Sequence, residues 1–472
     1  MNTFVNAVKN QKARTANGMK ARKSTADACV DLFYNIGASR GKNIVPNFVA
    51  AMVEDKDIAL RISAWVRDIR GGAGERQIFR DILKYLEKND FASCVALSRK
   101  VPELGRWDDL LVFETPEMKR VAFDMIRVAL SEDNGLCAKW MPRKGAVSNE
   151  LRTFLGWTPK FYRKRLVGLT NVVETQMCAK DWDNINFSHV PSVASARYKK
   201  AFGRNTSKYA DYIAALVKGD DPKVKVNASA IFPHDVLKGR IGRYNAFSAD
   251  ELKLIEKQWE ALPNYIGDKN VLPLVDVSGS MTCGAGGIGS TTTCMDVAVS
   301  LGLYLADKNT GKFKDTFLTF SASPELLYLK GNINQKIDQM IRSNWDMNTD
   351  LHKAFNKILS VAVNGNVPQS EMPDTILILS DMQFDRCVKF DDSAIKMIRR
   401  KYEAAGYKVP SVVFWNLNAS GNVPVKSNEF GVALVSGFSP AIVASVLGAD
   451  PEEFTPKAIM LKTVMQDRYA VL

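Results

Sequence analysis

Three oxygen-bearing side chains alternate along the chain directly after an apolar run. Asp276, Ser278 and Ser280 follow residues 271–275 in the stretch VLPLVDVSGSM. An apolar run without a polar break predicts a strand that is buried on both faces, as in a parallel sheet. Open α/β sheets bind their ligands at the carboxyl ends of such strands. One carboxylate and two hydroxyls are hard oxygen donors, which suit Mg²⁺ or another divalent cation such as Mn²⁺.

Two later segments supply further oxygen donors. Thr349 precedes a stretch with helical spacing and can offer a loop hydroxyl, and Asp381 ends a second apolar strand, TILILSD. The alternative is that Ser278 and Ser280 only cap a helix, since serine is favoured at helix N-termini. Capping does not explain why three separate segments each end in oxygen donors, so a metal site is the preferred interpretation.

Asp276, Ser278, Ser280, Thr349 and Asp381 together resemble the metal-ion-dependent adhesion site (MIDAS) of von Willebrand factor A (vWA) domains. The resemblance implies that the two serines and the threonine bind the metal directly. It implies that the aspartates bind it directly or through water. It also implies an open coordination position for an oxygen of a partner, such as a protein carboxylate.

The elements that would position these residues alternate between strands and helices along the C-terminal half. Further strands are predicted at 316–320, 325–329, 411–416 and 431–435, and helices at 295–307, 333–342, 351–361, 393–405 and 440–447. This alternation predicts a doubly wound α/β sheet. The pair FLTFSASPELLYL predicts one antiparallel edge strand. We assign residues 266–472 to a vWA-like domain on this basis.

A glycine-rich stretch in the same half offers a competing interpretation. Gly284, Gly286 and Gly289 match the G-x-G-x-x-G pattern of dinucleotide-binding loops. That motif has to leave a strand directly and open a helix. Here the strand has already ended at Asp276, so we interpret the glycines as a loop inserted beside the predicted metal site.

Charge is divided unequally between the two halves of the 472-residue chain. Residues 1–270 hold 45 Lys+Arg and 31 Asp+Glu, whereas residues 271–472 hold 19 and 20. The whole net charge of +13 therefore lies in the N-terminal half. A basic half predicts a polyanionic partner, and nucleic acid is the usual one. The alternative is that the surplus lysines only solvate the helices.

Helical periodicity dominates the basic half. Apolar residues recur at i, i+3 and i+4 in segments 47–53, 59–68, 77–86, 95–100, 108–113 and 118–130. Short breaks between them predict stacked helix pairs of the α-solenoid kind. The loop Gly71-Gly72-Ala-Gly74 could hold a phosphate on its amides, but it lacks the Lys-Ser/Thr ending of a P-loop. We interpret it as an interhelical turn.

Three clusters combine basic residues with aromatic ones, in KWMPRKG, FYRKR and SARYKKAFGRN. Their basic members are Lys139, Arg143, Lys144, Arg163, Lys164, Arg165, Arg197, Lys199, Lys200 and Arg204. Cations contact phosphates and aromatic rings stack on bases, so such clusters predict binding of RNA, as structured molecules or single-stranded ends. The alternative, which we favour for the aromatic rings taken alone, is that they face the core.

Several segments of the N-terminal half resemble the TROVE module of the Ro autoantigen family, and more closely its relatives in phages, plants and fungi. They are RDIRGGAGERQIFRDIL, VPELGRWDDLLVF, KWMPRKG, VPSVASARYKKAF and the stretch from FPHDVLK to QWEALPNYI. The resemblance implies HEAT-like helical repeats that form a ring closed by the A domain. It implies that the ring binds RNA within a ribonucleoprotein. We assign residues 27–265 to this module.

The first 26 residues hold six basic and no acidic side chains. We interpret them as a basic arm that contacts nucleic acid; organelle targeting is the alternative.

Catalytic motifs are absent from the sequence. No HExxH, GxSxG or Walker motif occurs, and the histidines, His189, His234 and His352, are far in sequence from any nucleophile context. We expect no enzyme; metal-assisted nuclease chemistry at Asp276 and Asp381 is the alternative.

The cysteines and the hydropathy of the chain indicate the cellular compartment in which we expect the protein. The seven cysteines form no CxxC pair, which favours neither zinc nor a disulfide framework. No apolar stretch of membrane-spanning length occurs, so we expect a cytoplasmic protein without a membrane partner.

Overall fold

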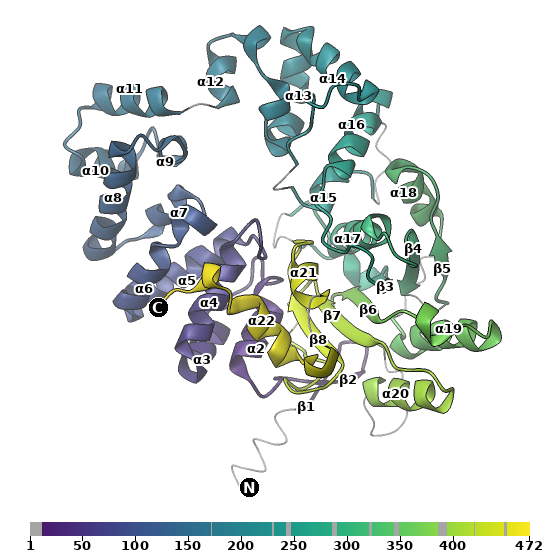
Figure 1. The fold of residues 1–472 in the computed structure, drawn as a ribbon. Helices are drawn as coiled ribbons and strands as arrows, with labels where there is room; N and C mark the ends of the chain where they lie inside the picture. The colour runs from purple at the N-terminus through teal and green to yellow at the C-terminus, as the bar shows by residue number, and fades with distance from the viewer. Residues whose placement is uncertain are drawn as a thin grey trace.

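The fold joins a long region of helices to one large sheet (Figure 1). A computed structural model describes residues 12–170, 172–228, 231–241, 247–285, 290–320, 323–343, 349–385, 394–419, 421–447 and 451–472. The two parts meet near residue 265: the last helix before the sheet ends at Glu260, and the first strand of the sheet begins at Val271.

The sheet has six strands in the order β5-β4-β3-β6-β7-β8. They are β3 (Val271–Asp276), β4 (Thr316–Phe320), β5 (Leu326–Tyr328), β6 (Thr375–Ser380), β7 (Ser411–Asn416) and β8 (Val432–Ser436). All neighbouring strands are parallel except β5, which is antiparallel to β4 at one edge. The prediction of a mostly parallel α/β sheet with one antiparallel edge strand is confirmed.

Apolar residues account for the position of β3 at the centre of this sheet. Every residue of β3 is buried, and Leu274 pairs with Leu318 of β4 on one side and Ile378 of β6 on the other. A parallel strand is covered on both faces and so needs an apolar run without alternation. The chain reverses its winding direction between β3 and β6, which makes their carboxyl ends the switch point of the sheet.

Helices cover the sheet and close its edges. They are η4 (Gly279–Thr282), α17 (Cys294–Lys308), α18 (Ile333–Arg342), α19 (Leu351–Asn364), η5 (Gln369–Glu371), α20 (Ala394–Ala404), α21 (Ile442–Leu447), η6 (Pro451–Glu453), α22 (Pro456–Val464) and η7 (Asp467–Tyr469). Helix α17, whose middle residues Val297–Ala306 are all buried, contacts β3, β4 and β6, while α22 contacts β8. The predicted helices of this half are therefore present.

The N-terminal half is helical. Its first elements are α2 (Ala28–Ile36), α3 (Val45–Glu54), α4 (Lys56–Arg67), α5 (Arg76–Asn89), α6 (Phe91–Ser98), α7 (Val101–Leu104), η1 (Trp107–Val112) and α8 (Pro116–Ser131). The later ones are α9 (Gly135–Trp140), α10 (Ala146–Phe154), α11 (Pro159–Leu169), α12 (Val173–Cys178), η2 (Trp182–Asn184), η3 (Phe187–His189), α13 (Ser192–Asn205), α14 (Lys208–Lys218), α15 (Pro233–Val236) and α16 (Ala249–Glu260).

Local chemistry explains where a helix such as α8 begins and which face it buries. Thr115 caps the N-terminus by accepting a hydrogen bond from the Met118 N–H, and Pro116 occupies the first turn, where its missing N–H costs nothing. Met118, Ala122 and Ile126 recur at helical spacing and are buried.

The helical region contacts the α/β domain at both of its ends. Helix α2 packs on β8 at the start, and α15 and α16 pack on α17 and α18 at the end. Between these contacts the helices run in an arc through α8 and α13 (Figure 1). A single hydrophobic core extends through α2–α11, α15, α16 and the sheet, whereas α12–α14 enclose a small core of their own. That these helices are HEAT-like repeats around a ring stays a prediction.

The glycine-rich loop Gly71–Gly74 connects α4 to α5, as expected of an interhelical turn. Its amides are used within the chain: Gly71 donates to Asp68 Oδ2, Gly72 to the Asp68 carbonyl and Ala73 to the Trp65 carbonyl. None of these three amides is therefore free to hold a phosphate.

The chain ends by packing back on its first helices. Arg468 of η7 forms an ion pair of 2.6 Å with the buried Asp68, and the Tyr469 hydroxyl donates to the same carboxylate. In the part of the chain that the structure describes, no helix is both long and apolar enough to cross a membrane.

Candidate functional site

Two carboxylates lie at the carboxyl ends of the neighbouring strands β3 and β6. Asp276 is the last residue of β3, and Asp381 directly follows Ser380, the last residue of β6. Both are buried, with 0% and 2% of their surfaces exposed. The parallel pairing of β3 with β6 brings them to the same edge, at the switch point where open α/β sheets bind ligands.

Asp276 is held by hydrogen bonds to both carboxylate oxygens. The Ser278 N–H donates to Oδ1 at 2.9 Å, and the Ser380 hydroxyl donates to Oδ2 at 2.6 Å. Burial, reinforced by the negative charge of Asp381, raises the pKa of Asp276 to about 7. Burial likewise raises the pKa of Asp381. Two buried carboxylates that repel each other would be stabilised by a cation between them.

Ser278 and Ser280 present their hydroxyls to each other, with 3.1 Å between the two Oγ atoms. Ser278 stands at the N-cap position of η4, yet its side chain makes no capping hydrogen bond. The capping interpretation therefore does not explain the hydroxyl of Ser278. Ser280 is exposed, so this side of the group is open to solvent.

Thr349 reaches the same group through the loop after β6. Its hydroxyl donates to the Gln383 carbonyl at 3.0 Å, and the Gln383 N–H donates to Asp381 Oδ1 at 3.1 Å. The Thr349 N–H donates a hydrogen bond to Asp385 Oδ2 at 2.7 Å. The structure thus links Thr349 to Asp381 through one intervening residue.

The donor set fits a hard divalent cation. It consists of two buried carboxylates and nearby hydroxyl groups, which are the oxygen ligands that Mg²⁺ and Mn²⁺ prefer. Within the described residues no cluster of three or more His, Cys, Asp or Glu side chains could hold a metal, so a zinc-type site is not found there. The metal site stays a prediction.

Sequence reasoning missed three residues around this group. Ser380 precedes Asp381 directly, so the Ser-Asp pair that ends β6 was the available signal. Gln383 and Lys42 carried no signal, because their proximity arises only in the fold. The charge of Lys42, from the loop after α2, opposes the rise in the pKa of Asp381 that burial causes.

Part of the predicted N-terminal arm docks beside this group. Residues 12–22 form a hairpin of β1 (Lys12–Arg14) and β2 (Lys20–Arg22). The Asn17 side chain donates to the Gln383 carbonyl at 2.7 Å, and the buried Thr15 donates to the Phe384 carbonyl at 2.6 Å. From Thr15 on, the arm is therefore held against the α/β domain; residues 1–11 lie outside the described residues.

Other predictions fall partly outside the described residues. Gly286, Gly287 and Gly289 of the glycine-rich loop lie there, as does Cys387. His234 is buried between Phe232 and Phe438, and burial lowers its pKa to about 4. It is a neutral core residue at physiological pH.

The ten predicted RNA-binding residues differ in their solvent exposure and in their contacts within the chain. The exposed ones are Lys144, Arg163, Lys164, Arg197, Lys200 and Arg204. The other four are engaged within the chain. Arg143 donates to the carbonyls of Ala138 and Met141, Arg165 pairs with Asp133 and Lys199 pairs with Glu251. Lys139 is half-buried, with its ammonium 5.3 Å from the centre of the Trp140 ring.

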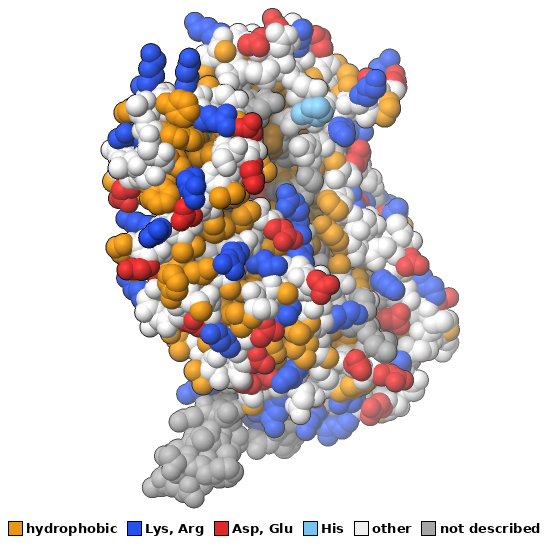
Figure 2. All heavy atoms as spheres, turned by 60° about the vertical axis from the view of Figure 1, so that its left-hand side comes forward, with side chains coloured by type: hydrophobic (Ala, Val, Ile, Leu, Met, Phe, Trp, Pro, Cys, Tyr) orange, Lys and Arg blue, Asp and Glu red, His pale blue; other side chains and the backbone are white. Residues whose placement is uncertain are grey.

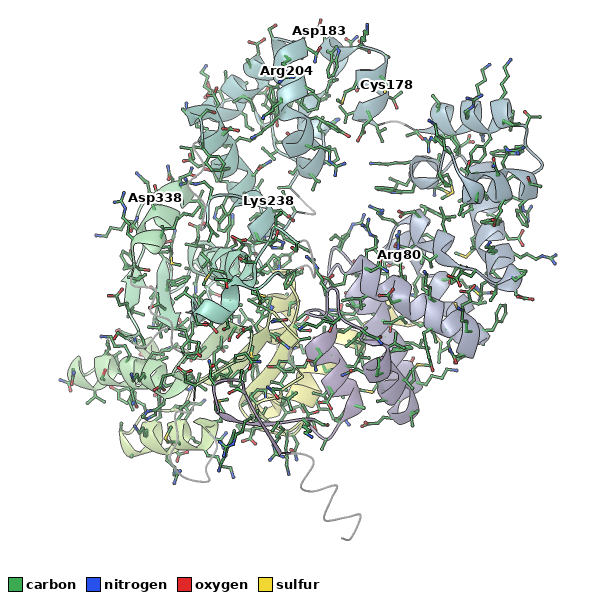
Figure 3. The ribbon with its side chains drawn as sticks, turned by 180° about the vertical axis from the view of Figure 1, so that it is seen from behind. Arg80, Cys178, Asp183, Arg204, Lys238 and Asp338 are labelled. Carbon is green, nitrogen blue, oxygen red and sulfur yellow. The ribbon has the colours of Figure 1, made fainter. Side chains whose placement is uncertain are left out.

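The structure brings two of the three clusters together. Helix α11, with FYRKR, packs on α9, and the Tyr162 hydroxyl donates to the Pro142 carbonyl at 3.0 Å. The third cluster lies on α13, within the separate small core. Figure 3 shows Arg204 there beside Asp183, away from Arg80 on α5.

The aromatic members of the clusters are mostly structural. Tyr162 and Phe202 are buried, as the core interpretation predicts, whereas Phe161 is 51% exposed. On the face formed by the first helices, basic side chains are scattered among acidic and apolar ones (Figure 2).

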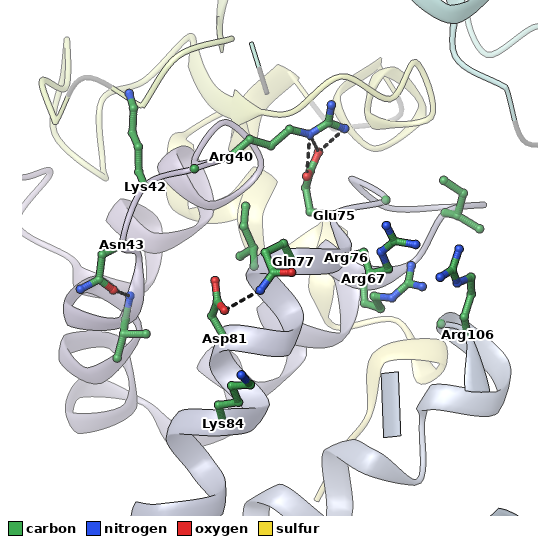
Figure 4. Close-up of a pocket in the computed structure, with 16 residues that line it drawn as sticks. Arg40, Lys42, Asn43, Arg67, Glu75, Arg76, Gln77, Asp81, Lys84 and Arg106 are labelled. Atoms are coloured by element: carbon green, nitrogen blue, oxygen red, sulfur yellow. Dashed lines mark hydrogen bonds and ion pairs between the residues drawn. The ribbon is translucent and has the colours of Figure 1, made fainter. Parts of the chain in front are cut away.

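A cationic cleft that sequence reasoning missed lies between the loop after α2 and the start of α5 (Figure 4). It encloses about 930 Å³. Its basic lining residues are Arg40, Lys42, Arg67, Arg76, Lys84 and Arg106, and its acidic ones are Glu75 and Asp81. Glu75 is buried and neutralises Arg40 at 2.7 Å, so the remaining cations outnumber the remaining acid.

Arg76 is the most available cation of this cleft. It forms no ion pair or hydrogen bond with any described residue. Partial burial, followed by the charges of Arg106 and Arg80, lowers its pKa. Figure 4 shows its guanidinium beside those of Arg67 and Arg106. Arg67 is neutralised by the buried Asp109 at 2.7 Å.

Arg106 connects the cleft to the first predicted cluster. Its guanidinium lies 3.7 Å from the centre of the Trp140 ring, in a cation–π contact. Trp140 and Lys139 belong to KWMPRKG, so this cluster and the cleft are continuous. The cleft was not predicted because its lining comes from four separate segments, and nothing in any one of them shows that the four meet.

Comparison with known proteins places this architecture in a family. Residues 158–272 match a domain of unknown function, DUF2828, and residues 270–468 match another, DUF7788. An uncharacterised protein of Acanthamoeba polyphaga mimivirus, L728, is 32% identical to the chain over 95% of its length and 86% of the viral protein. The chain belongs to the family of this viral protein. Its two matched domains divide at residue 270, where the helices give way to the sheet.

The fold of the chain is similar to that of a solved structure. The RO (RSR) protein of Deinococcus radiodurans superposes with a TM-score of 0.51 over 93% of this chain and 99% of its own, at 14% sequence identity. This chain therefore has a Ro-like fold, a helical region joined to an α/β domain. The C-terminal match is to DUF7788, and the vWA assignment stays a prediction.

Proposed function

We propose that this protein is a Ro-like RNA-binding protein that acts by binding and not by catalysis. The observation that carries the proposal is the cationic cleft, in which Arg76 has no partner among the described residues and Arg106 stacks on Trp140. Arg106 is also ion-paired with Asp108, so Arg76 is the guanidinium that is available to a phosphate. The neighbouring Trp140 ring offers a stacking surface for a base. The net charge of the N-terminal half and the Ro-like fold support the same function.

Binding of an RNA hairpin with a single-stranded 3′ tail tests this proposal. Affinity is measured by fluorescence anisotropy of the labelled RNA between 50 and 300 mM salt, with and without a chelator. We expect log K to fall by about 0.7 per phosphate contact for each tenfold rise in salt, because bound counterions are released. We expect the chelator to change nothing. Affinity that is independent of salt, or no binding at low salt, would contradict the proposal.

A second function concerns the group formed by Asp276, Ser278, Ser280, Thr349 and Asp381. We propose that it binds one divalent cation, which then captures a carboxylate of a protein partner. The support is the buried pair of mutually repelling carboxylates, whose charge a cation would balance. The protein would then act as a scaffold with RNA on one part and a protein on the other.

Titration with Mn²⁺, followed by electron paramagnetic resonance of the free ion, tests the second function. We expect one bound ion per chain and its loss in Asp276→Ala. The matched control is Asp338→Ala, which removes an exposed carboxylate on α18 that pairs with Arg240. Equal Mn²⁺ binding by Asp276→Ala and the unmodified chain would show that the group holds no metal.

A further inference from the structure

Cys283 and Cys294 face each other near Asp381. The group to which Asp381 belongs, with Asp276, Ser278, Ser280 and Thr349, is called the oxygen-rich group below. Their Sγ atoms are 3.4 Å apart. Cys283 follows η4 and is half-buried, whereas Cys294 begins α17 and is buried. The sequence offered no sign of this pair, because ten residues separate the two cysteines.

Backbone pairing fixes the two cysteines opposite each other. The Cys294 N–H donates to the Cys283 carbonyl at 2.9 Å, and the next residues inward, Gly284 and Thr293, form an antiparallel bridge. Directly opposed residues of an antiparallel pair have Cα atoms about 4.5–5.5 Å apart. Disulfides require about 4.4–6.8 Å between Cα atoms, so this backbone pairing is compatible with one.

The pair is distinctive among the cysteines. In the described part of the chain, Cys29, Cys94, Cys137 and Cys178 have no contact with a second thiol, and the first three are buried. The Cys29 thiol instead donates to the Ala51 carbonyl, and the Cys94 thiol donates to the Leu83 carbonyl. Among the described residues, thiol pairing is therefore a property of this one place in the fold.

We propose that Cys283 and Cys294 form a reversible disulfide when the protein meets hydrogen peroxide. The more exposed Cys283 attacks the peroxide as a thiolate. The O–O bond breaks, leaving a sulfenic acid on Cys283 and releasing hydroxide, which takes up the thiol proton as water. The Cys294 sulfur then attacks the sulfenic sulfur, the S–S bond forms, and the S–O bond breaks with loss of a second water. Two thiols lose two electrons and the peroxide gains them.

The disulfide would change a series of hydrogen bonds that connects Cys294 to Asp276 through Leu417 and Ser380. The Cys294 thiol donates to the Leu417 carbonyl at 3.5 Å, and the Leu417 N–H donates to the Ser380 carbonyl at 3.0 Å. Oxidation removes the thiol hydrogen, so the Leu417 carbonyl loses this donor. The crosslink also ties the residue after η4 to the first turn of α17, so the loop between them is closed at its base.

A second contact links the pair to the helical region. Asn418 donates to the Cys283 sulfur at 3.4 Å, and its own carbonyl oxygen accepts from Lys42 of the cationic cleft. The disulfide therefore forms at a junction between the cleft and the oxygen-rich group. Its formation depends on neither RNA binding nor metal binding, so the proposal stands apart from the proposed function.

The test uses the full chain with Cys178→Ser and Cys387→Ser, which removes the exposed cysteine and the one outside the described residues. The protein is treated with hydrogen peroxide, quenched with catalase, denatured, alkylated with iodoacetamide and mapped by mass spectrometry. We expect two alkylated thiols to be lost and a crosslinked peptide containing residues 283 and 294 to appear. Dithiothreitol should restore both thiols.

Three matched variants decide the outcome. Cys283→Ser and Cys294→Ser should each abolish the crosslink, and Cys29→Ser should leave it intact. The proposal is overturned if residues 283 and 294 both remain alkylated at a peroxide concentration that oxidises Cys178 in the unmodified chain. It is also overturned if Cys283 reaches the sulfinic acid while Cys294 stays alkylated. Both of these readouts are repeated on the unmodified chain, so a folding defect in a variant does not affect them.

Discussion

The Asp276 carboxyl group titrates far above its usual range because it is buried beside Asp381. Between its ordinary pKa of 3.8 and the folded value of about 7, the native state binds the proton more tightly than the unfolded state does. The free energy of unfolding of the metal-free protein therefore falls as pH rises through this range and stays low above it.

Asp276→Asn removes this titration while keeping the shape of the side chain. We expect the metal-free unmodified protein to lose about 2 kcal/mol more stability between pH 5 and pH 8 than the Asp276→Asn variant does. Urea unfolding in the presence of a chelator measures both differences. Equal pH dependence in the two proteins would mean that Asp276 is already ionised in the metal-free fold.

Arg76 supplies the sharpest residue-scale test of the RNA proposal, since its removal breaks no ion pair within the part of the chain that the structure describes. We expect Arg76→Gln to weaken RNA binding by about 1 kcal/mol and to reduce the salt slope by about 0.7, without changing stability. Lys314→Gln, which removes one exposed charge from the α/β domain, is the matched control. Equal effects of both substitutions would point to net charge and not to the cleft.

At the scale of elements, the close contact of α2 with β8 decides how the helices meet the sheet. The Gly37 N–H donates to Ser436 Oγ at 3.0 Å, and Asn416 donates to the Tyr34 carbonyl at 3.2 Å. A Cβ atom on Gly37 would lie 2.4 Å from the Ser436 carbonyl oxygen, so the interface requires glycine at this position.

Gly37→Ala should therefore destabilise the protein by about 1–3 kcal/mol through overpacking. The control is Gly203→Ala in α13, where an added Cβ meets nothing within 4 Å. There alanine should be neutral or stabilising by up to about 1 kcal/mol, because it is the better helix former. Thermal unfolding of both variants measures the contrast. A Gly37→Ala variant as stable as the unmodified chain would mean that α2 can shift on β8.

At the scale of the whole molecule, the hairpin of residues 12–22 and the C-terminal η7 both contact parts of the fold that lie far from them in sequence. The N-terminal hairpin binds the loop after β6, and the C-terminal η7 binds α4. Arg468 pairs with the fully buried Asp68, from which it is separated by 400 positions in the sequence.

Arg468→Ala should lower the free energy of unfolding by about 2 kcal/mol, since it leaves the Asp68 carboxylate buried without its main cation. Arg127→Ala, which removes an exposed pair with Asp124, should cost less than about 0.5 kcal/mol. Urea unfolding of the two variants compares them. Similar costs would show that solvent replaces Arg468 at Asp68.

Much of this protein follows from local sequence patterns. Apolar runs ending in Asp276 and Asp381 predict buried strands with oxygen donors at their ends, and helical periodicity predicts α3, α4, α5 and α8. These predictions succeed because periodicity and chain polarity act within one element. The same local patterns placed the oxygen donors at one edge, because parallel strands carry their carboxyl ends to the same side.

Only the tertiary structure decided which charged and reactive groups are free and which are paired. Arg143, Arg165 and Lys199 have the composition of an RNA-binding cluster, yet partners from other segments bind them. Arg76, which has no partner among the described residues, lies in a cleft that no single segment predicts, and Cys283 meets Cys294. Side-chain partners are chosen by contacts between distant segments, and no periodicity in the chain encodes those contacts.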